Sequence, residues 1–447
     1  LIEYMTQGCT PRHQWRIGCE HEKFGFRRAD LTPIPYDGPD GVRAILEGMM
    51  ERFGWAPILE NGKPIGLLQD GASVTLEPGG QVELSGAPLE TIHQIQQEIN
   101  THLEQLGAVC HDLNTAFLGI GAQPKWPFDD IPWMPKGRYR LMRAYLPTKG
   151  HLSLDMMART ATVQANLDFE SEADMVLKFR TSLAIQPLVT ALFANSPFIN
   201  GAPAGQLSHR AEIWRYTDPD RCGAIPFVFE PGFGFERYVD YALDTPMLFI
   251  YRNGQYMEGG GVPFRRYLEG THPALPGQHP TLDEWETHLS TLFPDVRLKR
   301  YLEMRGADAG NSANICALPA LWKGILYDDE ALNEVWQRIA GWTPEQRQRI
   351  HEEAPREALK TPINDRETLQ DLALFVLEKA RGGLHRLDCK NSDGCDESIF
   401  LDTLFQIAVS GQSPAETLLD AYHGRWNGSV DPLFLEEEYE SFYATCR

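Results

Sequence analysis

The chain has 447 residues, of which 42% are hydrophobic and 23% are charged, and its formal net charge is −21. This composition is typical of a globular protein, and the acidic balance argues against general binding to nucleic acid or to anionic membranes. No apolar stretch is long enough to span a bilayer, and the first residues show no secretory signal. The eight cysteines are scattered without a Cys-x-x-Cys pair, which predicts reduced thiols and a cytoplasmic location.

Residues 15–26 alternate between apolar and polar side chains, as a β-strand does. Glu20 and Glu22 lie two residues apart, so they would share one face of this strand. Two buried carboxylates side by side repel each other unless a cation or a proton intervenes. The pair alone is a weak signal and is more typical of a strand face that is covered by water.

Residues 74–85 predict a hairpin that turns at residues 78–80. A turn shifted by one residue would place Glu77 and Glu83 on opposite faces, so the composition of each face depends on this register. With the three-residue loop, the residues on the polar face are Thr75, Glu77, Gln81 and Glu83.

Two later segments show the same alternation. The polar side of residues 160–169 consists of Thr162, Gln164, Asn166 and Asp168, and residues 296–308 place Tyr301, Glu303 and Arg305 on one face. Each segment alone could belong to a half-exposed antiparallel sheet. Four such segments with acids and amides on their polar faces favour a shared, metal-binding concave surface.

Amphipathic helices are predicted between and after these strands. The spacing of apolar residues predicts helices over residues 88–107, 171–195, 329–340, 366–380, 414–422 and 435–443. Pro88 suits a first turn, Gly107 can end a helix, and Ser171 resembles an N-terminal cap. We expect a single catalytic body over residues 1–447, with a sheet-rich part at 1–327 and a mostly helical part at 328–447.

Clustered carboxylates indicate a particular chemistry. They hold hard divalent cations such as Mg²⁺, which prefers oxygen ligands and shares substrate phosphates. An arginine beside them, such as Arg305, could contact a transferring phosphoryl group. The sequence contains no Walker loop, dinucleotide-binding glycine motif, Gly-x-Ser-x-Gly elbow or His-Glu-x-x-His motif. Metal-dependent phosphoryl or acyl-phosphate transfer is therefore the class left open.

Six stretches resemble the plant and proteobacterial type of glutamate–cysteine ligase. They are residues 18–26, 75–85, 193–198, 226–230, 233–244 and 297–308. The likeness runs from about residue 15 to residue 327 and resumes near residues 417–432. It implies a glutamine-synthetase-like α+β fold, in which a curved antiparallel sheet flanked by helices forms the floor of the site. It also implies that ATP phosphorylates the γ-carboxylate of glutamate and that the amine of cysteine attacks the acyl phosphate.

The resemblance also implies roles for particular residues. The implied ligands of two or more Mg²⁺ ions are Glu20, Glu22, Glu77, Glu83, Gln164 and Glu303. Arg305 is the residue that would steady the transferring phosphate, with Glu303 beside it in the catalytic set. Arg138 and Arg210 could bind the two amino-acid carboxylates, although surface ion pairs would explain them as well. Asn166 could contact glutamate, and Trp214 and Tyr241 could wall the acceptor pocket, although core packing would explain both aromatic residues.

The sequence departs from the family pattern at residues 311–315, where two arginines and a tryptophan are absent. This change motivates an alternative, a γ-glutamyl ligase that uses another amine in secondary metabolism. Further alternatives are a guanidino-kinase-like phosphotransferase and a non-catalytic relative that binds metabolites. The positions of the plant members' regulatory disulfide are Gly259 and Ala274 here, so the resemblance implies a monomer that acts on small molecules alone.

Overall fold

The computed structural model describes residues 1–439. The largest β-sheet within these residues is antiparallel. Nine strands form it: β1 (Ile17–Arg27), β2 (Ala56–Glu60), β3 (Lys63–Gln69), β4 (Ala72–Leu76), β5 (Val82–Ser85), β6 (Thr115–Leu118), β7 (Thr162–Leu167), β14 (Val296–Leu298) and β15 (Leu302–Asp308). Their order is β14-β15-β7-β1-β5-β4-β3-β2, with β6 paired to one end of β1. The expected α+β fold with an antiparallel sheet is confirmed.

Helices and short strands make up the remaining regular structure. The helices are α1 (Ile2–Thr6), α2 (Val42–Phe53), α3 (Ile92–Leu113), α4 (Gly137–Tyr145), α5 (Ser153–Arg159), α6 (Glu172–Leu192), α7 (His209–Arg215), α8 (Phe235–Asp244), α9 (Phe264–Leu268), α10 (Leu282–Leu289), α11 (Ser312–Leu326), α12 (Asp329–Ile339), α13 (Pro344–Glu357), α14 (Leu369–Leu387), α15 (Asp402–Ser410), α16 (Pro414–His423) and α17 (Asp431–Glu436). The short strands are β8 (Phe198–Ile199), β9 (Ala202–Pro203), β10 (Cys222–Gly223), β11 (Phe249–Arg252), β12 (Gln255–Glu258) and β13 (Phe293–Pro294).

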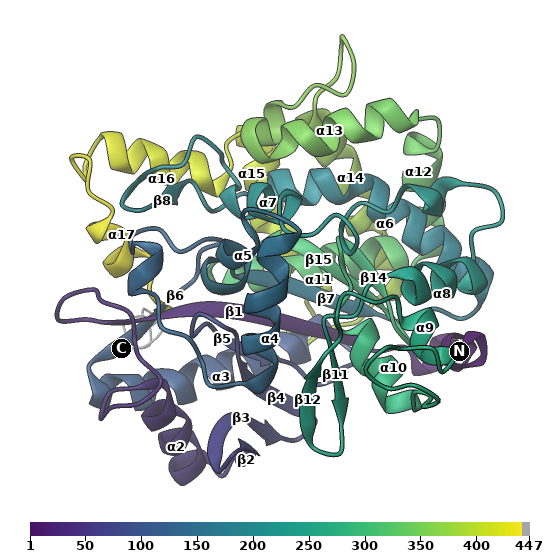
Figure 1. The fold of residues 1–447 in the computed structure, drawn as a ribbon. Coiled ribbons are helices and arrows are strands. Elements are labelled where there is room, and N and C mark those ends of the chain that lie inside the picture. The colour runs from purple at the N-terminus through teal and green to yellow at the C-terminus, as the bar shows by residue number, and fades with distance from the viewer. Residues whose placement is uncertain (440–447) are drawn as a thin grey trace.

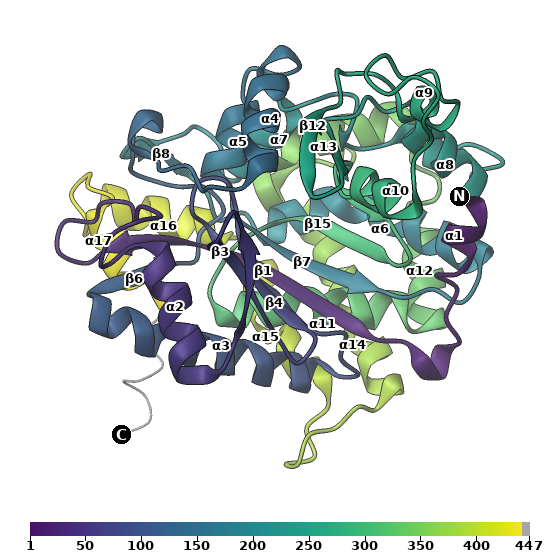
Figure 2. The same ribbon diagram turned by 60° about the horizontal axis from the view of Figure 1, so that its bottom comes forward.

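The two faces of the sheet have different neighbours. β1 crosses the middle of the molecule in Figure 1, and α3 and α11 pack against it. Figure 2 shows α3, α11 and α14 together on one side of the sheet, whereas α4, α5 and α7 lie on the other. We call the side of α4, α5 and α7 the cavity face, because the candidate site described below lies there.

The hairpin of β4 and β5 has the predicted register. Thr75 pairs with Glu83, and the backbone N–H of Glu77 donates to the carbonyl of Gln81 at 2.8 Å. The loop therefore consists of residues 78–80. Gly80 adopts a φ of +87°, which a side chain would disfavour, so glycine suits this position in the turn. This register places Glu77 and Glu83 on one face, as expected.

Residues 296–308 differ from the expected single run. They form a hairpin of β14 and β15, closed where the N–H of Lys299 donates to the carbonyl of Tyr301 at 2.9 Å. The turn brings Arg297 opposite Glu303. Between Met304 and residue 307 the register against β7 shifts, so β15 contains a β-bulge at Arg305.

Helix boundaries follow capping residues more closely than the apolar stripe. α3 begins after Thr91, whose hydroxyl accepts the N–H of Gln94 at 3.1 Å while the Gln94 side chain accepts the N–H of Thr91 at 3.0 Å. This capping box places the start of the helix after Pro88. α3 continues through Gly107 to Leu113 and ends at Asn114, which is left-handed with a φ of +54°. The expected bounds of 88–107 are therefore wrong at both ends.

Of the later predicted helices, those at α6, α12 and α16 agree with the structure, whereas the bounds of α14 and of the last predicted helix differ. α6 begins after Ser171, whose hydroxyl accepts the N–H of Asp174 at 3.2 Å, and α12 and α16 lie where predicted. α14 runs from Leu369 to Leu387, so it ends seven residues later than expected. A helix over 435–443 is wrong within the described part, because α17 ends at Glu436, and residues 440–443 lie outside it.

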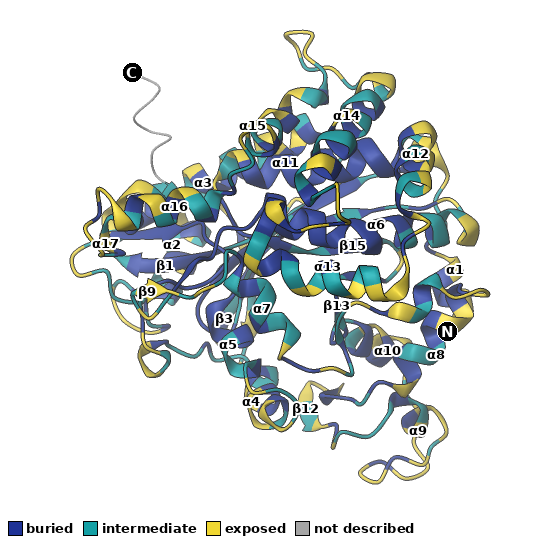
Figure 3. Ribbon diagram, turned by 90° about the horizontal axis from the view of Figure 1, so that it is seen from above, coloured by how far each residue is buried: buried dark blue, intermediate teal, exposed yellow. Residues whose placement is uncertain are grey.

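One large apolar core joins the sheet to the C-terminal helices. It includes buried residues of β1, β7 and β15 together with most of α6, α11 and α14. Figure 3 shows α6, α11 and β15 buried at the centre and the exposed residues on the outer helices. The division of the chain near residue 327 stays a prediction, because α11 and α14 pack into the same core as the strands.

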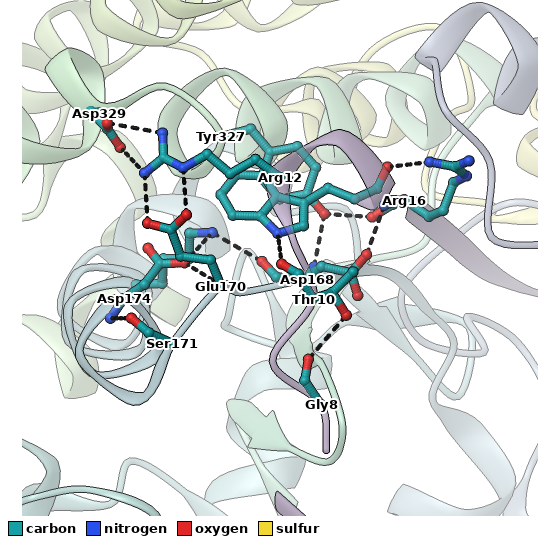
Figure 4. Close-up of polar contacts among 12 residues, drawn as sticks. Gly8, Thr10, Arg12, Arg16, Asp168, Glu170, Ser171, Asp174, Tyr327 and Asp329 are labelled. Carbon is teal, nitrogen blue, oxygen red and sulfur yellow. Dashed lines mark hydrogen bonds and ion pairs between the residues drawn. The ribbon is translucent and has the colours of Figure 1, made fainter. Parts of the chain in front are cut away.

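Polar contacts fix the segment that precedes β1. The guanidinium of Arg12 contacts the carboxylates of Glu170 and Asp329, each at 2.8 Å, and the N–H of Arg16 donates to Asp168 Oδ2 at 2.7 Å (Figure 4). Beneath them, Lys178 Nζ lies 3.6 Å from the ring centre of Trp15. Asp168, which follows the last residue of β7, is thus bound to the backbone of the segment that precedes β1.

No helix among residues 1–439 is both long enough and apolar enough to cross a membrane. The cysteines within the same residues all have free thiols, as expected. Cys446 lies outside the described residues.

Candidate active site

A cavity of about 400 Å³ lies over the cavity face of the sheet. The predicted residues that line it are Glu20, Glu22, Glu77, Glu83, Arg138, Gln164, Arg210, Trp214, Glu303 and Arg305. They come from β1, the β4–β5 hairpin, β7 and β15, and from α4 and α7. Residues far apart in the sequence therefore meet because β1 is paired with β5 on one side and with β7 on the other.

The strand registers place the carboxylates against one another. Glu22 pairs directly with Glu83 across β1 and β5, and Glu20 pairs with Gln164 across β1 and β7. Burial, together with the carboxylates of Glu303 and Glu83, raises the pKa of Glu20 to about 8. Burial and the charges of Glu77 and Glu83 likewise raise the pKa of Glu22 well above its usual range. The chain thus supplies too little positive charge to keep Glu20 and Glu22 ionised, so they bind a proton unless a cation takes its place.

Glu303 has the opposite environment. It is fully buried, and its carboxylate contacts Arg297 at 2.6 Å, Lys299 at 3.2 Å and Arg305 at 2.7 Å. Burial would raise the pKa of Glu303, but the three cations hold it well below the usual value. Glu303 is thus ionised and paired, and of the six expected metal ligands it is the least available to a metal ion.

The β-bulge positions Arg305 at the same wall. From Nη1 the guanidinium donates to Gln164 Oε1 and to Glu303 Oε2, each at 2.7 Å. The carbonyl of Arg305 accepts hydrogen bonds from the Thr162 hydroxyl at 3.1 Å and from Arg210 Nη2 at 2.8 Å. Backbone and side chain are therefore both fixed, which leaves a cationic group at a defined place in the cavity.

Two helices supply the other arginines. Ser208 caps α7 by accepting the N–H of Ala211 at 3.2 Å, and Arg210 and Trp214 then lie one turn apart on the same face. α4 carries Arg138, and its first N–H donates to Glu60 at 2.6 Å. Within residues 1–439, Nε of both arginines and Nε1 of Trp214 are buried without a hydrogen-bond partner. Buried donors of this kind favour a ligand that supplies acceptors.

Two predicted residues do not line the cavity. Asn166 lies beside it, where its amide donates to Glu20 Oε1 at 2.7 Å, so its contact with glutamate would be indirect. Tyr241 lies in α8, where its ring packs against Phe227 and Tyr238. Its expected place in the wall of the acceptor pocket is wrong, because the apolar face of α8 packs into the core.

Several lining residues were not predicted. Arg297 and Lys299 reach the cavity through the β14–β15 turn, and the methionines Met142, Met156 and Met157 line another wall. The first two alternate with Tyr301 and Glu303 along the sequence, so period-two spacing could have indicated them. The methionines have no such signal, because helix–helix geometry brings them together.

The donor set fits magnesium in its chemistry. Among the described residues, no three His, Cys, Asp or Glu side chains converge closely enough to hold one ion. Mg²⁺ commonly takes one or two carboxylates and completes its coordination with water and substrate phosphates. The unmet charge of Glu20 and Glu22 suits such an ion, so the residues present fit a site that ATP would complete.

The segment that departs from the family pattern lies elsewhere. None of residues 311–315 lines the cavity. Asn311 and Ala313 are exposed, and the Asn311 side chain caps α11 by accepting the N–H of Asn314 at 3.1 Å. The altered residues 311–315 motivated the alternative of another amine acceptor, but they do not line the cavity.

A histidine contacts both positions, 259 and 274, at which the plant members carry their regulatory disulfide. His272 Nε2 lies 3.2 Å from the carbonyl oxygen of Gly259, and its Nδ1 accepts the N–H of Ala274 at 3.2 Å. A Cβ at residue 259 would lie 2.5 Å from the carbonyl oxygen of Met247. This part of the chain is thus built around glycine and cannot take a larger residue there without a shift.

Comparison with known proteins identifies the family. The model of glutamate–cysteine ligase family 2 matches residues 16–436. A chloroplastic glutamate–cysteine ligase of Brassica juncea is 53% identical over 98% of this chain and 84% of its own length. Glutamate–cysteine ligase B of Oryza sativa subsp. japonica, also chloroplastic, is 53% identical over 98% of this chain and 86% of its own. The cytoplasmic location expected from the sequence is contradicted by these relatives.

A solved structure supports the fold alone. A glutamate–cysteine ligase from Francisella tularensis, crystallised with AMP, superposes with a TM-score of 0.55. The two chains are 12% identical, and the match covers 95% of this chain and 89% of the other. The arrangement of sheet and helices is thus shared at a sequence identity too low to transfer residue roles.

Proposed function

The chain belongs to glutamate–cysteine ligase family 2, and we propose that it carries out this ligation in the cavity described above, with ATP and Mg²⁺. The enzyme joins the γ-carboxylate of glutamate to the amine of cysteine, which is the first step of glutathione biosynthesis. Its substrates are small molecules. The observation that supports this site best is the meeting in one cavity of the half-buried carboxyl groups of Glu20 and Glu22, whose pKa values are raised, with the fixed guanidinium of Arg305.

The proposed reaction has two steps. An oxygen of the glutamate γ-carboxylate attacks the γ-phosphorus of ATP, so that ADP leaves and γ-glutamyl phosphate forms. The amine of cysteine then attacks the acyl carbon, phosphate leaves with the former carboxylate oxygen, and the amine nitrogen loses a proton. Arg305 would stabilise the negative charge on the transferring phosphoryl group, because Gln164 and Glu303 hold its guanidinium in place.

The proposed metal ligands are the acids that form no ion pair among the described residues, together with Gln164, whose Oε1 also accepts a hydrogen bond from Arg305. They are Glu20, Glu22, Glu77, Glu83 and Gln164. Bound Mg²⁺ would neutralise and align the anionic phosphates and the γ-carboxylate. Glu303, which was also expected to bind metal, would instead hold Arg297, Lys299 and Arg305 in their places.

Arg210 and Arg138, whose Nε atoms are buried, would bind different amino acids. Arg210 lies next to Arg305, to whose carbonyl it donates at 2.8 Å, so it suits the α-carboxylate of glutamate near the phosphoryl group. Arg138 comes from α4 on another wall and suits the carboxylate of the acceptor. Trp214, one helical turn after Arg210, would then border the glutamate site.

One incubation tests the proposed function. The enzyme with ATP, Mg²⁺, glutamate and cysteine should yield γ-glutamylcysteine, ADP and phosphate, detected by mass spectrometry. Omission of either amino acid should stop ADP release. A phosphorylated product without an amide would favour a phosphotransferase instead, and tight ligand binding without ATP consumption would favour a non-catalytic relative.

The proposal also covers the location and the oligomeric state of the enzyme. The names of the plant relatives point to a plastid for this enzyme in place of the cytoplasm. A monomer remains our expectation, since positions 259 and 274 carry glycine and alanine. Sedimentation of the purified protein would measure the oligomeric state.

A further inference from the structure

A buried carboxylate at the end of β15 joins three segments of the chain. Asp308 is the last residue of this strand and is 2% exposed. Its Oδ2 accepts hydrogen bonds from the hydroxyl of Ser196 at 2.6 Å and from the N–H of Asn195 at 2.9 Å. Its Oδ1 accepts a hydrogen bond from the hydroxyl of Ser208 at 2.8 Å. The carboxylate therefore holds the segment after α6 and the residue before α7 against the end of the sheet.

Both serines connect this carboxylate to the backbone of α7. The hydroxyl of Ser208 accepts the N–H of Ala211 at 3.2 Å. The hydroxyl of Ser196 accepts the N–H of Arg210 at 3.0 Å. Each hydroxyl thus donates to Asp308 and accepts from the first turn of the helix, so every member of this small network has its partners. Both serines are fully buried, and water therefore has no access to these bonds.

The strand that ends in Asp308 also carries Arg305. The β-bulge lies between the two, and the carbonyl of Arg305 accepts a hydrogen bond from Arg210 Nη2 at 2.8 Å. Arg210 is thus held to β15 twice, at its backbone through the serines and at its guanidinium through the bulge. Asp308 itself does not line the cavity, so any effect that it has on a substrate passes through α7.

On this basis, and on the function proposed above, we propose that Asp308 is a positioning residue for the glutamate site. It acts through Ser196 and Ser208, which hold the first turn of α7 and so place the guanidinium of Arg210 for the α-carboxylate of glutamate. A carboxylate suits this task because it has acceptor sites for all three donors. Asparagine at the same position would turn its NH₂ group toward one of them. A small displacement of Arg210 is enough to weaken the contact with the substrate.

Asp308→Asn tests this role directly, because it keeps the size of the side chain and removes one of its two acceptor oxygens. The KM for glutamate should rise by about tenfold or more, the effect of losing a hydrogen bond to a charged group. The KM for ATP should change little, because Gln164 and Glu303 still hold the guanidinium of Arg305. An unchanged KM for glutamate would overturn the proposal.

A double-mutant cycle separates positioning from a general loss of structure. In the Arg210→Ala enzyme the guanidinium that Asp308 would place is absent, so adding Asp308→Asn should change kcat/KM for glutamate little. The initial slope of rate against glutamate concentration gives this value without saturation. An equal fold-change in the presence and absence of Arg210 would overturn the proposal, because a purely structural effect does not depend on that guanidinium.

The two serines provide a second test, which decides the question if Asp308→Asn does not fold. Ser196→Ala and Ser208→Ala each remove one donor to Asp308 together with one acceptor for an N–H of α7. Each should raise the KM for glutamate in the same direction as Asp308→Asn. An unchanged KM in both variants would overturn the proposal.

Asp168→Asn is the matched control. Asp168 follows the neighbouring strand β7, accepts the N–H of Arg16 at 2.7 Å and does not line the cavity. Its substitution should leave the KM for glutamate unchanged, and a rise equal to that of Asp308→Asn would overturn the specific role of Asp308. Failure of the proposed function would differ from all these outcomes, since the unsubstituted enzyme would then form no amide.

Discussion

Arg305 donates from Nη1 to Glu303 Oε2 at 2.7 Å, and this pair occupies the wall of the cavity next to the carboxylates of β1. The contact has a consequence for catalysis. Glu303 does not neutralise Arg305 alone, since Arg297 and Lys299 share the same carboxylate. A net positive charge therefore remains for an anionic substrate.

We expect Arg305→Ala to reduce kcat by about 100- to 1,000-fold, as removal of a group that stabilises transition-state charge does. The thermal midpoint should change much less than kcat. Arg356→Ala is the control, because Arg356 is exposed and pairs only with the adjacent Glu357 at the surface. Steady-state rates of ADP release measure the effect, and activity close to that of the unsubstituted enzyme would exclude Arg305 from the reaction.

Glu303→Gln should affect stability as well as activity. The substitution leaves Arg297, Lys299 and Arg305 without their buried carboxylate, and loss of one partner of such a network costs about 3 to 5 kcal/mol of unfolding free energy. Urea denaturation measures this cost. If the free energy of unfolding were unchanged while activity was lost, Glu303 would act as a metal ligand and would not serve as the anchor of the cations.

The stability of the metal-free enzyme should fall as the pH rises. Burial and the neighbouring Glu303 and Glu83 raise the pKa of Glu20 from 4.5 to about 8, so the folded state binds a proton that the unfolded state releases. The contribution is fully present below about pH 4.5 and is lost as the pH rises through about 8, at up to about 1.4 kcal/mol per pH unit. Urea titrations in the presence of a chelator measure this dependence.

The matched variant for this pH dependence is Glu20→Gln, which should flatten the profile over the same range. Mg²⁺ should also oppose the loss of stability, because a cation can replace the proton. A profile for the unsubstituted enzyme that is flat or rises with pH would contradict a raised pKa of Glu20.

Asn311→Ala should change stability without changing the choice of acceptor. Loss of the cap of α11 should cost about 1 kcal/mol, because the N–H of Asn314 loses its acceptor. No residue of 311–315 lines the cavity, so the ratio of kcat/KM for cysteine over other amines should remain the same. A changed ratio would favour the alternative function, in which the enzyme uses an amine other than cysteine.

Much of the sheet could be predicted from the sequence because side chains two apart share a face of a strand. β7 has one apolar and one polar face, and the glycines at 79–80 indicate the turn of the β4–β5 hairpin. β1 alternates less strictly, because the face opposite Glu20 and Glu22 also carries the buried His21 and Lys23. The turn between β14 and β15 was missed because Lys299-Arg300-Tyr301 contains no glycine or proline. The pairing of β7 with β1 and with β15 joins residues more than a hundred positions apart, which no local pattern indicates.

The site was predicted less completely for a related reason. The carboxylates share strands with recognisable alternation, so Glu20, Glu22 and Glu83 could be grouped in advance. Tyr241 was misplaced because its role rested on the family resemblance alone, and no local pattern places α8 relative to the cavity. The position of the three lining methionines depends on how α4 and α5 pack together, and no local pattern reports that packing.

The central claim is that this cavity activates glutamate as an acyl phosphate. Glutamate labelled with ¹⁸O in its γ-carboxylate tests it most directly, in an incubation with ATP, Mg²⁺ and cysteine. The account predicts that one labelled oxygen appears in the released phosphate for each γ-glutamylcysteine formed, and that Arg305→Ala slows both products equally. Formation of the dipeptide with unlabelled phosphate would contradict it.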